Sequence, residues 1–401
     1  MNAPTEWQTS SDSVSSQGCE CIRWLVRTLC LLAAVLALWP ILPVATAAAL
    51  VPALSPFVAV SAILTTWGLP MMVWLGLIVV LVRRRLFCRW VCPVGLCMDG
   101  ASRLGRRLGR RTGSFPRLGP WIVLFTLGGA CLGYPFLLWL DPLARFAGLF
   151  DLGSRGPTLG VVFSMVTFLA MLAISFRWPN AWCGCVCPLG AFQDLLSLVF
   201  QSLRSLVRRK PAAGLLPRRM LLGAVAGAAF AAVTGPSRRR MSRPLRPPGA
   251  VDEPAFVGLC TRCGNCVRAC PSGIIERDLG GNGWAGLLTP VLSFHRDYCR
   301  EDCVRCAQAC PSGALKRVPQ AKKGAVRLGL PRVDMSLCLL GEDRECSLCR
   351  SRCPYDAVRY VFSEADYTLT PQIDPDKCNG CGACEAACPT SPHKAIIVFP
   401  A

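Results

Sequence analysis

Histidine is almost absent from this chain, with only His295 and His393 among 401 residues. Both lie outside the long apolar segments, so the sequence excludes a haem held by two histidines within a membrane. No C-x-x-C-H string occurs, which excludes an attached c-type haem. No G-x-G-x-x-G or Walker A motif follows a strand pattern, so we expect neither flavin nor nucleotide.

Charged residues are also scarce. They make up 17% of the chain, against 52% hydrophobic residues, whereas a globular domain usually has about 25% charged residues. This composition predicts a membrane protein. Nearly all of the net charge of +20 lies in residues 1–250. The arginines there separate apolar runs instead of forming a basic amphipathic face, so we expect lipid and no nucleic acid as a partner.

Three apolar runs contain no charged residue: 28–82, 118–140 and 156–176. A helix needs about 20 such residues to cross the hydrocarbon core. The first run is long enough to cross twice, with the proline-containing "VPALSPF" as a turn or re-entrant piece. The sequence therefore predicts four membrane helices, near residues 24–44, 58–82, 119–140 and 157–177.

The arginines also predict the orientation of these helices. Residues 83–117 contain ten arginines and one aspartate, and residues 177–219 are similarly basic, whereas 45–57 has no charge and 141–156 is balanced. Because cytoplasmic loops collect Lys and Arg, we expect both basic segments and the amino terminus on the cytoplasmic side of a bacterial inner membrane. Residues 1–21 are polar and acidic, which predicts a disordered tail and no cleavable signal.

A fifth apolar segment, residues 216–235, lies within a basic linker at 201–250 and allows two interpretations. Arg218 and Arg219 at its start resemble a twin-arginine export signal, which would carry the following domain across the membrane after it has folded around its metal. The alternative is a short membrane helix with ordinary flanking charges. The five arginines of the following "SRRRMSRPLR" disfavour export under the positive-inside rule.

Cysteine is abundant, with 26 residues, and its spacing is regular. The core C-x2-C-x3-C-P occurs four times in residues 251–401, and one further cysteine precedes each core. The four motifs comprise Cys260, Cys263, Cys266 and Cys270; Cys299, Cys303, Cys306 and Cys310; Cys338, Cys346, Cys349 and Cys353; and Cys378, Cys381, Cys384 and Cys388.

These motifs predict four [4Fe–4S] clusters. A cubane cluster needs four thiolates from different directions, and in bacterial two-cluster runs the fourth cysteine of a motif ligates the other cluster. Zinc knuckles, the alternative, pair two C-x2-C elements across a longer gap and do not need the Cys-Pro. Motifs one and four share the regular spacing, so we expect a nested pairing of the outer two motifs and of the inner two. In that pairing Cys388 completes the first cluster, Cys270 the fourth, Cys353 the second and Cys310 the third.

Two further C-x3-C-P motifs lie at the inner ends of the second and fourth predicted helices. Together they could offer four thiolates to one additional iron–sulfur site. A redox-active thiol pair or simple structural thiols explain the same residues, and the sequence does not distinguish these interpretations. The four cysteines are Cys88, Cys92, Cys183 and Cys187, with Cys97 and Cys185 as spare ligands.

The stretch "RPPGAVDEPAFVGLCTRCGNCVRACPSGII", the irregular openings of the inner motifs and the twin-arginine segment resemble the exported four-cluster ferredoxin of periplasmic nitrate reductase systems, the NapG family. The four helices with paired C-x3-C-P motifs resemble its membrane partner, the NapH family. From about residue 22 onward the chain therefore resembles a natural fusion of the two. It departs from the membrane family, which usually ends in its own cytoplasmic two-cluster ferredoxin.

The resemblance implies quinol from the quinone pool as the electron donor, and a periplasmic multihaem cytochrome or reductase as the acceptor. Related proteins serve amine dehydrogenase maturation or copper oxidase assembly, so a maturation factor that delivers electrons to a metalloenzyme is the alternative function. Quinol oxidation needs a proton acceptor near the membrane surface. Asp141, one turn before Arg145, is the candidate, and a solvated loop acid or a helix stop before Pro142 is the structural alternative.

Together these patterns predict an α-helical transmembrane bundle of four or five helices, followed by an α+β domain of two bacterial-type 2[4Fe–4S] ferredoxin-like units. The expected order is a disordered tail at 1–21, a membrane domain at 22–200, the basic linker at 201–250 and the ferredoxin-like domain at 251–401. The resemblance implies that this last domain is periplasmic.

Overall fold

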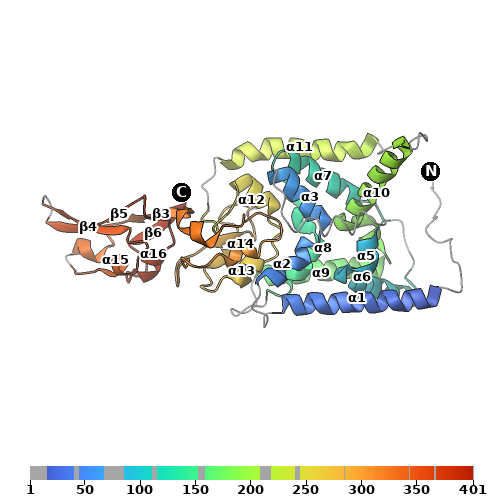
Figure 1. The fold of residues 1–401 in the computed structure, drawn as a ribbon, viewed down its shortest axis with the longest axis horizontal. Helices are drawn as coiled ribbons and strands as arrows, with labels where there is room; N and C mark the ends of the chain where they lie inside the picture. The colour runs from blue at the N-terminus through green and yellow to red at the C-terminus, as the bar shows by residue number, and fades with distance from the viewer. Residues whose placement is uncertain are drawn as a thin grey trace.

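The structure is a computed structural model. It describes residues 16–39, 45–66, 85–110, 115–151, 159–207, 218–239, 244–283, 285–342, 344–364 and 367–400. A helical part extends to residue 239, and a ferredoxin-like part begins at residue 244 (Figure 1). The helical elements are α1 (Ser16–Leu38), α2 (Ala45–Ala53), α3 (Pro56–Thr66), α5 (Leu86–Trp90), α6 (Pro93–Arg107), α7 (Gly119–Cys131), the 3-10 helix η1 (Phe136–Leu140), α8 (Pro142–Gly148), α9 (Leu159–Arg177), the π-helix η2 (Trp182–Val186), α10 (Pro188–Val207) and α11 (Arg218–Arg239).

Two described helices are long and apolar enough to cross a membrane, judged by length and composition alone. They are Glu20–Leu38 within α1 and Leu159–Arg177, which is α9. The first begins before the predicted span at 24–44, because α1 extends back to Ser16 into the segment predicted as a disordered tail. Of the second predicted span, at 58–82, the structure describes only the part up to Thr66, and residues 67–84 lie outside the described residues.

The third predicted helix, at 119–140, is interrupted. Helix α7 ends at Cys131 and is followed by Gly133 in a left-handed conformation with φ of 84°. Glycine accepts this conformation without strain and commonly ends helices, and Pro135 then prevents the α-helix from continuing. The prediction of one continuous helix is therefore wrong, and the chain turns into the short helix η1.

The two basic segments predicted as loops contain helices. Residues 83–117 include α5 and α6, and residues 177–219 include η2 and α10. Helix α6 packs along α9, where Ser102 Oγ donates to the Ser175 carbonyl at 3.2 Å. Cationic side chains are favourable near the negative carboxyl end of a helix dipole, and the arginines that suggested a loop include two in the last turn of α6.

Helix α11 packs closely against α7, and glycine permits this approach. A Cβ atom added to Gly128 of α7 would overlap the Ala224 backbone, and one added to Gly227 of α11 would overlap the Phe125 backbone. Small residues that bring helix backbones together are typical of membrane helix packing. The fifth apolar segment therefore forms a helix that packs closely onto the rest of the helical part.

The ferredoxin-like part consists of two units with few, short strands. Unit 1 (244–318) contains α12 (Glu253–Leu259), α13 (Asn265–Ala269), β1 (Ile275–Arg277), β2 (Pro290–Leu292) and α14 (Arg305–Gln308). Unit 2 (320–400) contains the 3-10 helices η3 (Gln320–Ala325) and η4 (Leu339–Glu342), the strands β3 (Gly329–Val333), β4 (Val358–Ser363), β5 (Thr368–Ile373) and β6 (Ile396–Pro400), and the helices α15 (Leu348–Ser351) and α16 (Ala383–Ala387).

Each unit is closed by antiparallel pairing of its two ends. In unit 2, β3 pairs with β6 from Gly329↔Pro400 to Val333↔Ile396, and β4 pairs with β5 as a separate hairpin. In unit 1, β1 pairs with β2, and the closing contact is a single antiparallel bridge, Ala250↔Leu315.

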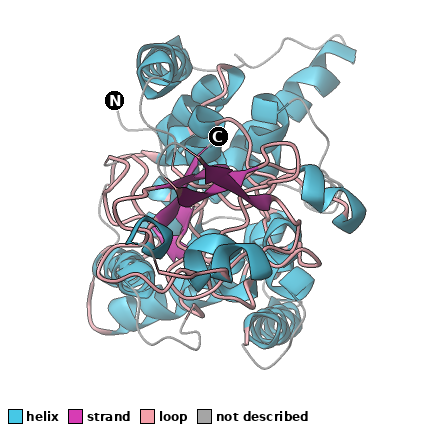
Figure 2. Cartoon of the chain, turned by 90° about the vertical axis from the view of Figure 1, so that its left-hand side faces the viewer, coloured by secondary structure: helices cyan, strands magenta, loops and turns pink. Residues whose placement is uncertain are grey.

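Unit 1 lies directly against the helical part, and unit 2 lies beyond it (Figure 1). Helix α12 contacts α3, α11 and η1, and both α13 and α14 contact α2. One continuous apolar cluster runs through this junction, with Phe57 and Leu143 on the helical side and Phe256 and Leu259 on the other. Viewed from the ferredoxin-like end, the strands lie in front, near the centre of the surrounding helices (Figure 2).

Candidate metal centres

The sixteen patterned cysteines form four groups of four, each around a small cavity. The grouping follows the chain sequentially, and we label the groups by their order along the molecule. Site A contains Cys260, Cys263, Cys266 and Cys310; site B contains Cys270, Cys299, Cys303 and Cys306; site C contains Cys353, Cys378, Cys381 and Cys384; and site D contains Cys338, Cys346, Cys349 and Cys388.

The nested pairing predicted from motif regularity is therefore wrong. Cys310, not Cys388, completes the first group, and Cys388 lies in site D. Motif one exchanges its fourth cysteine with motif two within unit 1, and motif three does so with motif four within unit 2. The irregular spacings of the inner motifs are loop differences that do not affect which motifs pack together.

The Cys-Pro step explains why the fourth cysteine leaves its own motif. Helix α13 ends at Cys270, which is extended with φ of −79° and ψ of 111° and precedes Pro271. Helix α16 ends in the same way at Cys388, before Pro389. A residue before proline is sterically restricted to extended conformations. The proline thus directs the fourth thiol away from the local loop and toward the neighbouring site.

Each group of four thiols surrounds a cavity and has the ligand set of an iron–sulfur cluster. The cavities at sites A, B, C and D have volumes of about 30, 20, 10 and 30 Å³. Backbone amides also point at sulfur, since Leu315 N–H donates to Cys310 and Ala357 N–H to Cys353, both at 3.4 Å.

The four sites follow one another along the molecule. Sites B and C lie next to each other across the two units, where the Cys299 amide donates to the Cys381 carbonyl at 2.9 Å. Helix α16 carries Cys384 of site C, and α15 carries Cys349 of site D; in Figure 1, α16 lies between α14 and α15. The order is A, B, C and D from the helical part outward.

The two C-x3-C-P motifs of the helical part come together at a fifth group of thiols, the bundle site. In each motif the first cysteine lies in a short helix, α5 or η2, and the second caps the helix that begins at the following proline. All four thiols line one cavity of about 640 Å³, together with Cys185. The bundle site comprises Cys88, Cys92, Cys183 and Cys187.

Polar contacts join the two halves of the bundle site. Gln193 Nε2, from α10, donates to Cys88 Sγ at 3.0 Å. Arg85, just before α5, forms an ion pair with Asp194 of α10, and its Nε lies 2.8 Å from Asp194 Oδ1. These contacts hold the first motif against the helix that follows the second.

Burial disfavours the free thiolate at the bundle site. Desolvation raises the pKa of Cys88, Cys92 and Cys187 to about 12. Reactive free cysteines usually have a lowered pKa, whereas burial shifts these pKa values in the opposite direction. A metal that displaces the thiol protons supplies the missing stabilisation, because metal binding and deprotonation are coupled.

Helix α8 lies between the bundle site and site A. Its N-cap is Asp141, which is fully buried. Asp141 Oδ1 accepts hydrogen bonds from the amides of Leu143 and Ala144 at 3.0 and 3.1 Å, and Oδ2 accepts one from Ser55 Oγ at 2.5 Å. Desolvation raises the pKa of Asp141 to about 6. The structural alternative of a solvated loop acid is therefore wrong. The alternative of a helix stop before Pro142 is confirmed, since Asp141 ends η1 and also begins α8. Its role as a proton acceptor stays a prediction.

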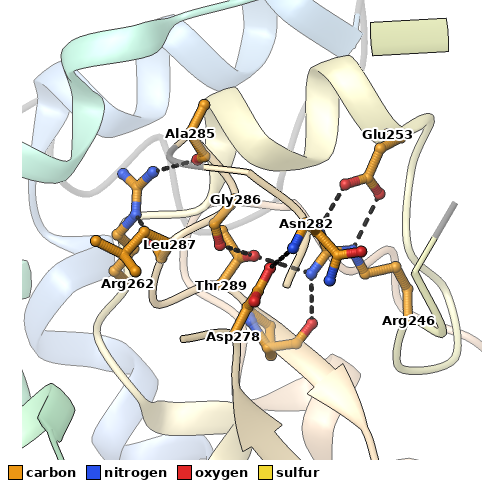
Figure 3. Close-up of polar contacts among 10 residues, drawn as sticks. Arg246, Glu253, Arg262, Asp278, Asn282, Ala285, Gly286, Leu287 and Thr289 are labelled. Carbon is orange, nitrogen blue, oxygen red and sulfur yellow. Dashed lines mark hydrogen bonds and ion pairs between the residues drawn. The ribbon is translucent and has the colours of Figure 1, made fainter. Parts of the chain in front are cut away.

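Sequence reasoning missed the arginines around site A. Arg145 lies one turn after Asp141 and donates through Nη2 to the Thr261 carbonyl within motif one. Arg262 donates to the Ala285 and Leu287 carbonyls, both at 2.8 Å (Figure 3). In the sequence, Arg145 stands alone among apolar residues and Arg262 stands between two cysteines, and this isolation was the only sign of a role. The two arginines come close to each other only because unit 1 packs on α8.

These groups of cysteines define an iron–sulfur protein of the ferredoxin type, and family profiles agree. A profile described as a 4Fe-4S binding domain matches residues 63–111 and 161–210, which include both C-x3-C-P motifs of the bundle site. A profile described as a 4Fe-4S dicluster domain matches residues 259–314 and 344–391, one stretch in each unit.

The chain belongs to the family of ferredoxin-type proteins that includes MauM, NapF and NapG. It is 36% identical over 170 residues to the methylamine utilization ferredoxin-type protein MauM of Methylophilus methylotrophus. This match covers 40% of this chain and 73% of MauM. Ferredoxin-type protein NapF of Escherichia coli strain K12 is 34% identical over 153 residues, 38% of this chain and 85% of NapF. NapG of the same strain is 35% identical over 166 residues, 39% of this chain and 70% of NapG. No solved structure matches the chain significantly.

Proposed function

We propose that the chain is a membrane-bound iron–sulfur protein that takes electrons from quinol and passes them to a periplasmic redox partner. The observation that carries the proposal is the arrangement of the sites, since the bundle site and sites A to D follow one another along a single molecule. Bound [4Fe–4S] clusters would carry single electrons between these positions. The sixteen cysteines of sites A to D and the four of the bundle site would be the ligands.

Exposed apolar side chains on three helices support a multi-pass membrane domain. Monomeric soluble proteins rarely expose large contiguous apolar patches. On α1, α9 and α11, many large apolar side chains are more than half exposed, and lipid would cover them. They include Leu25, Leu29 and Leu36; Leu159, Val166 and Leu169; and Leu222, Val225 and Val233.

Aromatic and arginine side chains support a membrane interface at the bundle-site end. Arg103 lies 4.1 Å from the ring centroid of Trp24, and Arg177 lies 5.0 Å from that of Trp178. Tryptophan is enriched at both membrane surfaces, and arginine on the cytoplasmic side. We therefore propose that the bundle site faces the cytoplasm and that the ferredoxin-like part, at the opposite end of the helices (Figure 1), is periplasmic.

Iron analysis tests the number of sites. If all five are filled, the purified full-length protein should contain about twenty iron atoms per chain, four for each cluster. A content of about sixteen iron atoms that does not fall when Cys88 and Cys183 are replaced by serine would show that the bundle site holds no cluster. It would leave the rest of the proposal intact. About four iron atoms per chain would contradict the proposal as a whole.

A reporter fusion tests the proposed orientation. An enzyme that is active only after export, fused after Ala250, should be active, because α11 carries the chain from the bundle-site end to the ferredoxin-like end (Figure 1). The same reporter fused after Arg110, next to the basic carboxyl end of α6, should be inactive. Activity at the second position and none at the first would reverse the orientation and exclude a periplasmic partner.

An electron-delivering maturation factor for a metalloenzyme is the second candidate. The similarity to MauM, a methylamine utilization protein by its name, favours it. Steady turnover with a reduced quinone analogue and a cytochrome acceptor would support the first function, and a single round of electron delivery to an immature metalloenzyme would support the second.

A further inference from the structure

Site A differs from the other sites in the positive charge around it. Arg262 and Arg277 line its cavity. Arg145, from α8, interacts electrostatically with Cys260 and Cys263, and Arg268 does so with Cys263 and Cys266. We call these four residues the arginine cage: Arg145, Arg262, Arg268 and Arg277.

The guanidinium groups of the cage donate most of their hydrogen bonds to backbone carbonyls. These carbonyls are neutral, so they do not compensate the positive charge of the arginines. Arg145 is fully buried and donates to the Thr261 carbonyl, while its Nε and Nη1 have no hydrogen-bond partner in the part of the chain that the structure describes. Arg262 donates to two carbonyls (Figure 3). Arg268 Nη1 lies 3.1 Å from the Leu38 carbonyl and 3.3 Å from the Phe150 carbonyl. Buried cations of this kind call for a nearby anion.

Among the residues that the structure describes, two carboxylates face the four arginines of the cage. Asp151 forms an ion pair with Arg277. Asp141 lies one turn from Arg145, and its oxygens accept hydrogen bonds from Ser55 and from the amides of α8. Burial, followed by repulsion from Arg262 and Arg277, lowers the pKa of Arg145 to about 9. An anion at site A would relieve this repulsion.

Fewer cations approach each of the other sites among the described residues. At site D, Lys394 donates to the Cys388 carbonyl. At site B, the buried Lys323 interacts with Cys299. At site C, Arg327 interacts with Cys378, but half of its side chain is exposed, and Asp374 lies near the same cysteine. Solvent screens an exposed charge more strongly than a buried one.

Positive charge favours the reduced form of an iron–sulfur cluster. Four thiolates make the cluster anionic, and one added electron increases its negative charge, so the potential depends on net charge and surroundings. The attraction between two unit charges roughly 10 Å apart, at an effective dielectric constant of about 20, changes an equilibrium constant roughly tenfold.

We propose that the arginine cage makes the cluster at site A the most readily reduced of the four in the ferredoxin-like part. Through Arg145, the helical part sets the potential of the first site that electrons reach after the bundle site. Arg145 is a positioning and tuning residue, not a ligand. This inference rests on the proposed occupancy of site A by a cluster.

Redox titration of the full-length protein, followed by EPR, tests the inference. Arg145→Gln should weaken the electron affinity of one cluster about tenfold, which corresponds to a midpoint potential about 59 mV lower for one electron. Arg145→Lys, which keeps the charge, should stay near the wild-type potential. The affected signal should be the one that Cys310→Ser alters, and the other three midpoints should not move.

The double variant Arg246→Gln/Glu253→Gln is the matched control, because it removes a buried arginine of unit 1 together with its ion-pair partner and so leaves the net charge unchanged (Figure 3). It should leave the site A potential unchanged. If Arg145→Gln does not assemble, Arg268→Gln, at the less buried edge of the cage, should shift the same signal in the same direction. An unchanged site A midpoint in a variant with wild-type iron content, or an equal shift in Arg145→Lys, would overturn the inference. Absence of a site A signal from the wild-type protein would instead contradict the proposed function.

Discussion

Replacement of Cys187 by serine is expected to stop quinol from reducing the clusters of the ferredoxin-like part. Cys187 caps α10 and lies in the bundle site with the three other thiols of the two C-x3-C-P motifs. Changes to groups that only support a metal ligand usually cost 10–100-fold in affinity or activity, so loss of a ligand should lower the rate at least about 100-fold. Stopped-flow absorbance after mixing with a reduced quinone analogue measures this rate.

A chemical reductant separates this effect from a general loss of structure. Dithionite should still reduce sites A to D of the Cys187→Ser protein, because their ligands lie in units 1 and 2 and are unchanged. Cys131→Ser serves as the control, since Cys131 is exposed at the end of α7. Its rate should equal that of the wild-type protein. A Cys187→Ser protein that quinol reduces at the wild-type rate would exclude the bundle site from the electron path.

The second large effect concerns the pairing of motifs. Cys310→Ser should alter the EPR signal of site A, because Cys310 shares the cavity of Cys260, Cys263 and Cys266. Cys388→Ser should instead alter site D and leave site A intact. A small metal-dependent unit owes much of its folding free energy to its metal, so each variant should also destabilise its own unit.

Limited proteolysis of the two variants checks the assignment by unit. Cys310→Ser should increase cleavage within unit 1 and Cys388→Ser within unit 2, in each case with loss of up to about four iron atoms. If Cys388→Ser altered site A and exposed unit 1 to cleavage, the nested pairing would be restored. Cys131→Ser should match the wild-type cleavage pattern in both units.

The chemistry of the sites could be predicted from local sequence. Four C-x2-C-x3-C-P motifs with preceding cysteines specify the ligand type and number, because the tight loop and the Cys-Pro step are local features. The matches to a 4Fe-4S dicluster profile support the predicted type of cluster. A shared site for Cys88, Cys92, Cys183 and Cys187 was one of the interpretations that the sequence left open, and the structure places all four around one cavity.

Features that depend on packing between distant segments could not be predicted in this way. The partner of each fourth cysteine depends on how two motifs fold together, and regular spacing was misleading for Cys388. Helix α8 lies within a segment whose balanced charge suggested only a loop. Arg145 contacts site A only because unit 1 packs on α8. This packing brings the Thr261 carbonyl, 116 positions later in the chain, to the Arg145 side chain.

The closure of unit 2 by its own ends has a consequence for modularity. Because β3 begins at Gly329 and its partner β6 ends at Pro400, the unit starts and finishes at one place, and motifs three and four both lie between. Unit 2 is nevertheless not an independent module, because Lys323 donates to the Arg300 carbonyl and the Cys299 amide donates to the Cys381 carbonyl across the boundary with unit 1. Removal of unit 2 would therefore expose site B, so the last two sites cannot be lost without a cost to the second.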